Sequence, residues 1–335
     1  MIDNESDERR SVVLEAWRRF WFAPEPAYPL GLVRIAFGAL VVAWTASLLP
    51  DLYDLFGEQG VIPKQPDWDY VWGLFGIASS DHALLIGWVV LLVSAVALTV
   101  GWHSRMAALV VFVLIHSFQA RSPFVFNSGD GLIRVVALVL VFSSCGAALS
   151  LDRRRASGSF WSAELRAPWA IRLLQVQLSL VYLSTVNAKL AGDSWREGTA
   201  VSYALRYDDM LIVPTPDWLT SNALLMNVAT WGTLVLELAL GVLVWVKPLR
   251  RWVLGAGLLM HSTIMITIGV GFFTPAMFVL YLAFIPPDTV RRLPTTIRRH
   301  IAAARSALRW RRRLDDDVPP ERVESTAESV PEGVR

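Results

Sequence analysis

The chain of 335 residues is far more apolar than an ordinary water-soluble protein: 54% of its residues are hydrophobic, 18% are charged, and 15 are Trp. This composition is typical of integral membrane proteins and excludes a conventional soluble domain. A net charge of +2 hides local clusters of Arg and Lys. Because Cys145 is the only cysteine, an intrachain disulfide is excluded and no metal site built on cysteines is expected.

Apolar stretches long enough to cross a bilayer as helices, roughly 17 to 25 residues, recur along the chain. We place them at about 28–50, 82–102, 106–122, 130–149, 168–190, 221–246, 252–269 and 271–287. They predict an all-α, polytopic transmembrane bundle of about eight spans, covering residues 28–287. The third and the last are short, and Pro275 interrupts the last, so each is open to being tilted or re-entrant. Residues 1–17 are charged and lack the order of a cleavable signal, so the first span is expected to remain as an anchor.

The distribution of Lys and Arg predicts the orientation in the cell membrane. With the N-terminal segment 1–27 in the cytoplasm, the outer loops hold only Lys64, Arg121, Arg196 and Arg206 of the 31 cationic residues. Most others lie in the segments placed inside, as the positive-inside rule requires. The tail, 288–335, is therefore cytoplasmic as well. It opens with nine Arg between Arg291 and Arg313 and then becomes acidic, which indicates contact with membrane lipid followed by disorder; nucleic acid is not an expected partner.

The predicted outer loops, 51–81 and 191–220, are long and rich in aromatic residues. Trp68, Trp72 and Phe75 recur at helical spacing, which favours a short helix lying on the membrane face. An aromatic loop packed on the bundle fits equally well, and the sequence leaves both interpretations open.

Polar side chains inside predicted spans need a partner or a purpose, because burying them in lipid is costly. The topology places several of them in the outer half of the bilayer, with His261 near its middle. If the spans that carry them are neighbours, they converge on one pocket that opens outward. This set is His116, Gln119, Asn127, Asp130, Arg134, Asn187, Lys189 and His261.

Several of these residues have two interpretations. Asp130 and Arg134 share one helix face and are expected either to form an ion pair or to take part in chemistry. His116 and His261 are hydrogen-bonded packing residues or catalysts. Lys189 either extends its ammonium to the interface as an anchor or, partly buried, acts as a base toward a phenol-like substrate.

Glu237 lies deep in the sixth predicted span and must be protonated or paired. Arg34 and Arg172 are its candidate partners, and the sequence does not choose between them. Signatures of common soluble enzymes are missing from the sequence, including the P-loop, HExxH, GxSxG and the dinucleotide fingerprint.

The segment YLSTVNAKLAGDSWREG, which begins at Tyr182, is followed by SYALRY. Together they resemble the membrane half of vitamin K-dependent gamma-glutamyl carboxylase and its bacterial relatives, the HTTM-domain proteins. The resemblance is specific over 182–206 and extends in order and hydropathy over about 28–287. The residues that carry it are Tyr182, Lys189, Leu190, Asp193, Trp195, Glu197, Gly198, Tyr203, Arg206, Glu237, His261 and the SLD of Ser150 to Asp152.

The resemblance implies that Lys189 deprotonates a reduced quinone similar to vitamin K hydroquinone. We take Lys189, Asp130 and His261 as candidate catalytic residues, with no metal. The candidate ligand-binding residues are His116, Asn127, Arg134, Asn187, Trp195, Tyr203 and Arg206. Two departures from the carboxylase pattern argue against carboxylation of a protein glutamate: Asp130 stands where that family has a histidine, and the large lumenal domain is not expected here.

Three functions remain in competition, and the sequence leaves open whether the chain is catalytic. The leading one is a membrane enzyme, or enzyme-like protein, that binds a quinol-like ligand and uses Lys189 as a base. The second is a non-catalytic or maturation partner of a small exported peptide or protein, similar to the HTTM protein that assists a sporulation-delaying toxin. The third, a transporter, needs a polar path across the whole bilayer, whereas the polar residues gather on the outer side.

Overall fold

The computed structural model describes residues 2–61 and 72–295, which are almost entirely helical. Residues up to Val290 form one compact unit, and those from Arg291 onward belong to a second. All the named elements lie in the first unit. Its long helices are α1 (Ile2–Phe22), α2 (Tyr28–Ser47), α5 (Asp81–Val100), α6 (Ser104–Arg121), α7 (Ser128–Phe142), α9 (Trp169–Leu190), α13 (Ala223–Val242), α14 (Lys247–Thr267) and α15 (Phe273–Leu282).

Short elements connect the long helices. One antiparallel strand pair joins the start of α2 to the start of α9. The short elements are α3 (Leu52–Phe56), α4 (Leu74–Ile77), α8 (Leu151–Ser157), α10 (Asp193–Arg196), α11 (Ala200–Ala204), α12 (Asp217–Thr220), η1 (Pro123–Val125), η2 (Asp208–Met210), η3 (Leu243–Trp245), β1 (Glu25–Pro26) and β2 (Leu165–Arg166).

Four helices of the described chain are long and apolar enough to cross a membrane: α2, α5, α9 and α13 with its extension to Trp245. A fifth is added if the bent pair of α15 and Pro287–Thr295 is counted as one span. The other predicted spans coincide with α6, α7 and α14, which do not reach that length or apolarity. The 15 residues of α7 extend over ~22 Å, less than a hydrocarbon core of ~30 Å. The chain is thus an α-helical membrane protein, and the count of about eight spans stays a prediction.

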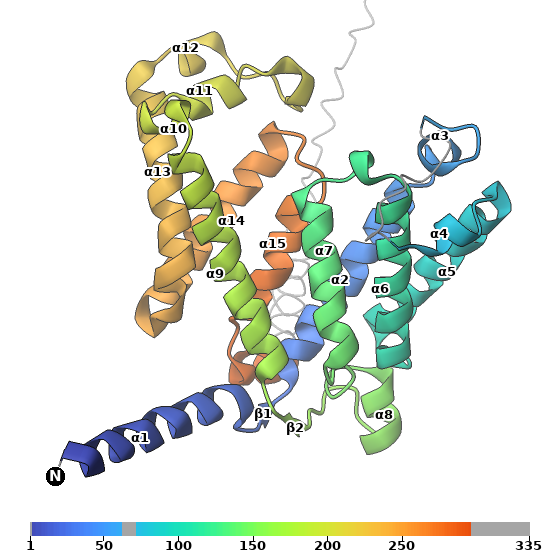
Figure 1. Cartoon of the computed structure of the whole chain (residues 1–335), viewed down its shortest axis with the longest axis vertical. Coiled ribbons are helices and arrows are strands. Elements are labelled where there is room, and N and C mark those ends of the chain that lie inside the picture. The colour runs from blue at the N-terminus through green and yellow to red at the C-terminus, as the bar shows by residue number, and fades with distance from the viewer. Residues whose placement is uncertain (1, 62–71, 296–335) are drawn as a thin grey trace, which may run out of the picture. The chain divides into compact units, whose positions relative to one another are not determined.

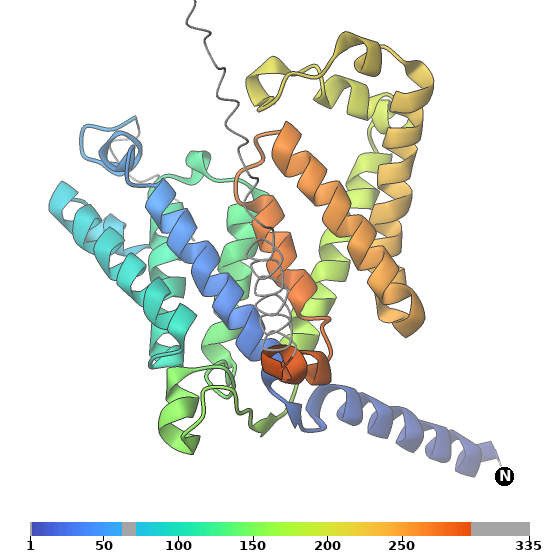
Figure 2. The same ribbon diagram turned by 180° about the vertical axis from the view of Figure 1, so that it is seen from behind.

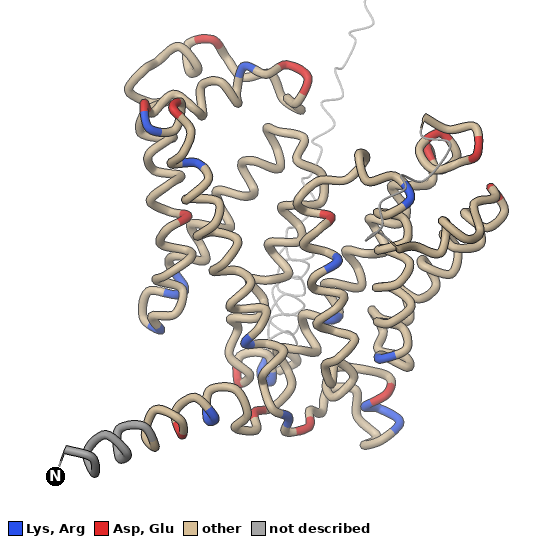
Figure 3. The backbone as a smooth tube through the Cα atoms, in the orientation of Figure 1, with Lys and Arg blue, Asp and Glu red and all other residues tan. Residues whose placement is uncertain are grey.

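The long helices form two groups joined by α15. Helix α5 packs between α2 and α6, α7 packs on α6 and α2, and α13 packs on both α9 and α14. Helix α15 contacts α2, α7, α9 and α14, and α9 also contacts α7 and α2 directly. Figure 1 shows α15 between the two groups, and Figure 2 shows the same arrangement from behind. Outward-facing side chains such as Val93, Val235 and Leu259 are apolar and exposed, which is the surface that a lipid-embedded bundle presents. Most charged residues lie toward the helix ends (Figure 3).

Arg34 holds three parts of the first group together from inside. Its guanidinium is fully buried and donates to the carbonyl oxygens of Thr99 at 2.7 Å, Leu149 at 2.5 Å and Cys145 at 3.1 Å, and also to that of Leu98. The end of α5 and the connection from α7 to α8 are thereby fixed to α2. The Arg34 guanidinium is bound to these backbone carbonyl groups and is not the partner of Glu237.

The first predicted outer loop, 51–81, and the tail, 288–335, are each described in part. Trp68 lies outside the described residues, as does the tail from residue 296. From Trp72 onward the predicted outer loop packs on the bundle: Phe75 of α4 is buried, and the Leu74 amide donates to Ser117 Oγ at 3.1 Å. This part of the loop therefore agrees with the packed interpretation.

Candidate functional site

Lys189 and Glu237 form an ion pair between α9 and α13. Lys189 Nζ donates to Glu237 Oε1 at 2.5 Å, and the two side chains are 20% and 8% exposed. The Trp195 ring covers the ammonium, with Nζ 4.3 Å from the ring centroid. The lysine is therefore sheltered inside the protein and does not simply extend to the interface.

The predicted partners of Glu237 were wrong. Arg172 donates to Glu25 Oε1 at 2.8 Å and to Gln175 Oε1 at 3.1 Å. It lies in the first turn of α9, whereas Lys189 lies in the last turn of the same helix. Helix α13 packs along α9. Glu237 lies at the height of the last turn of α9, so its partner there is Lys189.

A hydrogen-bonded cluster of Tyr182, His261 and Tyr281 lies behind this pair. The Tyr182 hydroxyl is 2.8 Å from His261 Nε2 and also contacts the Tyr281 hydroxyl. All three side chains are buried. Tyr182 precedes Lys189 by two helical turns and so shares its face of α9. Gly257 leaves room for the cluster, since a Cβ at that position would lie 2.5 Å from the Tyr281 hydroxyl oxygen.

Two buried polar atoms around this cluster have no hydrogen-bond partner among the described residues: Glu237 Oε2 and His261 Nδ1. Leaving such an atom unpaired costs about 1–3 kcal/mol. Glu237 and His261 are 6% and 3% exposed, so bulk water does not satisfy them. A small polar group bound between α9, α13 and α14 would remove that cost, and a hydroxyl is the simplest group that both donates and accepts.

Asp130 has a different environment at the start of α7. Its Oδ1 accepts from Trp44 Nε1 at 2.7 Å, and its Oδ2 accepts from the Asn127 amide at 2.8 Å. Asn127 in turn caps α7 by accepting from the Gly129 amide at 2.7 Å. The carboxylate thus completes a capping box and ties α7 to α2.

The predicted ion pair between Asp130 and Arg134 was wrong. Both residues lie in the described part of the chain, but their side chains have different partners. Arg134 Nη1 is 3.4 Å from His116 Nδ1, and the His116 ring lies tilted against that of Trp72, with centroids 4.3 Å apart. Asp130 does not turn to Arg134 because its two oxygens are already bound by the Trp44 indole and the Asn127 amide.

The HTTM domain family model matches residues 22–289, most of the chain. The chain belongs to the HTTM family. The uncharacterized protein YitO of Bacillus subtilis strain 168 is 22% identical to this HTTM chain over 225 residues, which is 64% of this chain and 71% of YitO. No solved structure matches the chain.

The polar residues of the HTTM domain do not all converge on one pocket, as the sequence had suggested. Lys189, Trp195 and His261 lie around Glu237 and Tyr182, whereas Asp130 and His116 belong to clusters on α6 and α7. Phe273 lies between the two regions: its ring centroid is 5.8 Å from that of His261, and its Cα lies against Gly129. Gly129 permits this approach, because a Cβ there would lie 2.6 Å from the Cα of Phe273.

Three further candidate ligand-binding residues of the HTTM domain form no hydrogen bond or ring contact with Lys189 among the described residues. Asn187 is exposed, and the Tyr203 side chain is 66% exposed. Arg206 donates to the Thr220 carbonyl oxygen at 2.7 Å and so fixes the loop that carries α11 and α12. Their roles as ligand contacts remain predictions.

The sequence did not reveal the role of Tyr281. It lies within an apolar helix, and nothing in its spacing points to Tyr182, which is 99 residues away. Tyr182 itself was detectable, because it shares a helix face with Lys189. Among the described residues, no group of three or more His, Cys, Asp or Glu is arranged to hold a metal ion.

Proposed function

We propose that this HTTM protein spans the cell membrane about eight times, with both termini in the cytoplasm, and binds a quinol-like ligand beside Lys189. The distribution of Lys and Arg supports this orientation. It places the Lys189 end of α9, with α10 to α12, on the outer side. A lipid-soluble ligand would reach this depth from the bilayer.

The observation that carries the proposal is the sheltered Lys189–Glu237 pair with an unpaired carboxylate oxygen next to it. A lysine acts as a base only when its amine has lost its proton. Glu237 provides a place for that proton, because its Oε1 lies 2.5 Å from Lys189 Nζ in one short hydrogen bond. With the proton on the carboxyl group, the Lys189 amine is neutral and accepts another proton.

In the proposed step, the amine of Lys189 takes the proton of a ligand hydroxyl. The O–H bond of the quinol breaks, its electron pair stays on the oxygen, and an ammonium forms beside the resulting oxyanion. The Trp195 ring favours the ammonium through a cation–π contact. His261 Nδ1 is a second hydrogen-bonding group available to the ligand.

The experiment uses the purified full chain in detergent, without oxygen, with a soluble naphthohydroquinone as the probe. Binding is measured by equilibrium dialysis, and deprotonation by the absorbance of the hydroquinone anion. We expect Lys189→Met to weaken binding about tenfold, the effect of losing one charge-assisted hydrogen bond, and to abolish the anion signal. The matched control is Lys247→Met, an exposed lysine at the other predicted face, which should leave both unchanged.

Equal binding and an equal anion signal in Lys189→Met and the unchanged chain would exclude the proposed role. A chain that retains a small exported peptide and ignores the hydroquinone would instead support the maturation-partner function. The two outcomes are separated by mass analysis of what the purified chain carries.

A further inference from the structure

A second candidate site lies at the other end of the helices from Lys189. A cavity of about 510 Å³ opens between the α5–α6 connection, the α7–α8 connection, α8 and β2. Its volume is in the range of small-molecule sites. The ionic side chains in its wall are Arg105, Asp152, Arg153, Glu164 and Arg166. In the proposed topology this end of the bundle faces the cytoplasmic leaflet.

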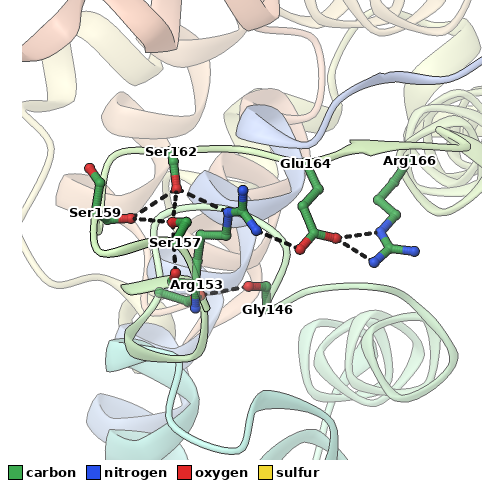
Figure 4. A network of polar contacts seen from close by, with 8 residues as sticks. Gly146, Arg153, Ser157, Ser159, Ser162, Glu164 and Arg166 are labelled. Carbon is green, nitrogen blue, oxygen red and sulfur yellow. Dashed lines mark hydrogen bonds and ion pairs between the residues drawn. The ribbon is translucent and has the colours of Figure 1, made fainter. Parts of the chain in front are cut away.

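The two carboxylates of the cavity are already bound within its wall. Glu164 lies between two guanidinium groups, with Oε1 2.7 Å from Arg153 Nη1 and Oε2 2.9 Å from Arg166 Nε (Figure 4). Asp152 accepts from the Ser104 amide at 2.8 Å and from the Ser104 hydroxyl at 2.7 Å. Both carboxylates therefore already have partners within the wall, and neither forms an ion pair with Arg105 among the described residues.

Arg105 is the arginine of the cavity wall that stays available to a ligand. Within the described residues it has no carboxylate partner, and its Nε makes only a long contact of 3.4 Å to the Ser143 carbonyl oxygen. An arginine carries five N–H donors, so its terminal nitrogens are left to bind a ligand. Three arginines against two carboxylates leave the cavity with an excess positive charge of one, which matches one phosphodiester.

The wall is held in a fixed shape before any ligand binds. Arg153 Nε donates to Ser162 Oγ at 3.0 Å, and the Ser162 and Ser157 hydroxyls are 2.6 Å apart (Figure 4). Gly146 allows a close approach, since a Cβ there would lie 2.9 Å from Ser104 Oγ. A site that is already ordered loses little entropy on binding.

Apolar side chains continue from the cavity along the outside of α6. Met106 lines the cavity and is 59% exposed, and Trp102 and Leu109 beside it on the chain are also exposed. Met106 and Leu109 are three residues apart and share one face of α6. A ligand that fits this surface has an anionic head and an apolar body.

We propose that this cavity binds the head group of an anionic phospholipid, with the phosphate on Arg105 and the acyl chains along Met106 and Leu109. Guanidinium groups bind phosphate through paired hydrogen bonds. A zwitterionic lipid has the same phosphate but adds an ammonium, which the excess positive charge disfavours. A soluble phosphate compound has no acyl chain for α6 to hold.

Native mass spectrometry of the full chain in a neutral detergent tests this proposal, with dioleoylphosphatidylglycerol as the probe. We expect Arg105→Gln to weaken binding about tenfold. Arg155→Gln, an exposed arginine on α8 that does not line the cavity, should bind as the unchanged chain does. Met106→Gln should weaken binding through loss of the acyl contact, and thermal unfolding confirms that each variant is folded.

Four results would overturn the proposal. Equal binding by Arg105→Gln and the unchanged chain would mean that Arg105 does not hold the phosphate. Equal weakening by Arg155→Gln would mean that general charge attraction accounts for the binding. Equal binding of dioleoylphosphatidylethanolamine would exclude selection for an anionic lipid. Displacement of the lipid by a similar concentration of glycerol 3-phosphate would show a soluble phosphate ligand instead.

Discussion

The Lys189 ammonium and the Glu237 carboxylate lie 2.5 Å apart, although 48 residues separate them in the chain. The pair joins the last turn of α9 to the middle of α13. One carboxylate oxygen, Oε2, is buried without a hydrogen-bond partner among the described residues. The pair is therefore a structural link between two helices that keeps one buried polar atom without a partner.

Removing the charge of Glu237 should destabilise the protein. Glu237→Gln leaves the Lys189 ammonium partly buried without its counter-charge, and we expect a loss of about 3 kcal/mol. Thermal unfolding in detergent measures it. In Lys189→Met with Glu237→Gln, both charges are gone, so the double variant should be more stable than the sum of the separate Lys189→Met and Glu237→Gln losses predicts. Glu58→Gln, at an exposed position, is the control, and strict additivity would contradict the pair.

The Tyr182 hydroxyl should contribute to stability through its two partners. Tyr182→Phe removes the contacts to His261 and Tyr281 without changing the ring, and we expect a loss of about 1–3 kcal/mol. Chemical unfolding followed by Trp fluorescence measures the change. Tyr207→Phe alters a 56% exposed side chain and should have no effect. A Tyr182→Phe protein as stable as this control would show that the cluster contributes nothing.

Stability should fall in acid because of Asp152. Partial burial raises the pKa of this carboxyl group, but hydrogen bonds from Ser104 and the His103 amide outweigh it, so the pKa lies below its usual value. The unfolded group titrates at about 3.9. Its contribution is therefore complete above that pH and is lost as the pH falls through the lower folded-state pKa.

Asp152→Asn tests this pH dependence. The variant should have a lower unfolding temperature at neutral pH and a smaller further decrease between about pH 5 and pH 3 than the unchanged chain. Asp209→Asn, at an exposed position, should retain the full acid decrease. An Asp152→Asn protein with the same pH profile as the unchanged chain would contradict the role of this carboxylate.

Arg34 should be among the least replaceable residues of the bundle. Arg34→Met removes the donors to four backbone carbonyl groups in a fully buried position. Several buried acceptors without partners should cost at least about 3 kcal/mol. The measurement is the yield of monodisperse protein in size-exclusion chromatography together with its unfolding temperature. Arg251→Met, at an exposed position, should change stability by less than about 0.5 kcal/mol.

The hydropathy and the charge pattern of the sequence determined the class of this protein. Long apolar stretches can be satisfied only as helices in lipid, since every backbone hydrogen bond then closes within one segment. This physical constraint is local, so the sequence alone predicts helices at α2, α5, α9 and α13. The motif around Lys189 likewise sufficed to indicate the HTTM family, because its residues are close together in the chain.

The tertiary structure decided which polar side chains meet. Asp130 and Arg134 are one helical turn apart, yet Asp130 binds Trp44 of α2 because its rotamer is fixed by the capping box at the start of α7. Glu237 has Lys189 as its partner because α13 packs along α9 at that depth. Helix neighbours and their relative heights depend on packing across the whole bundle, and a periodicity within one helix carries no information about them.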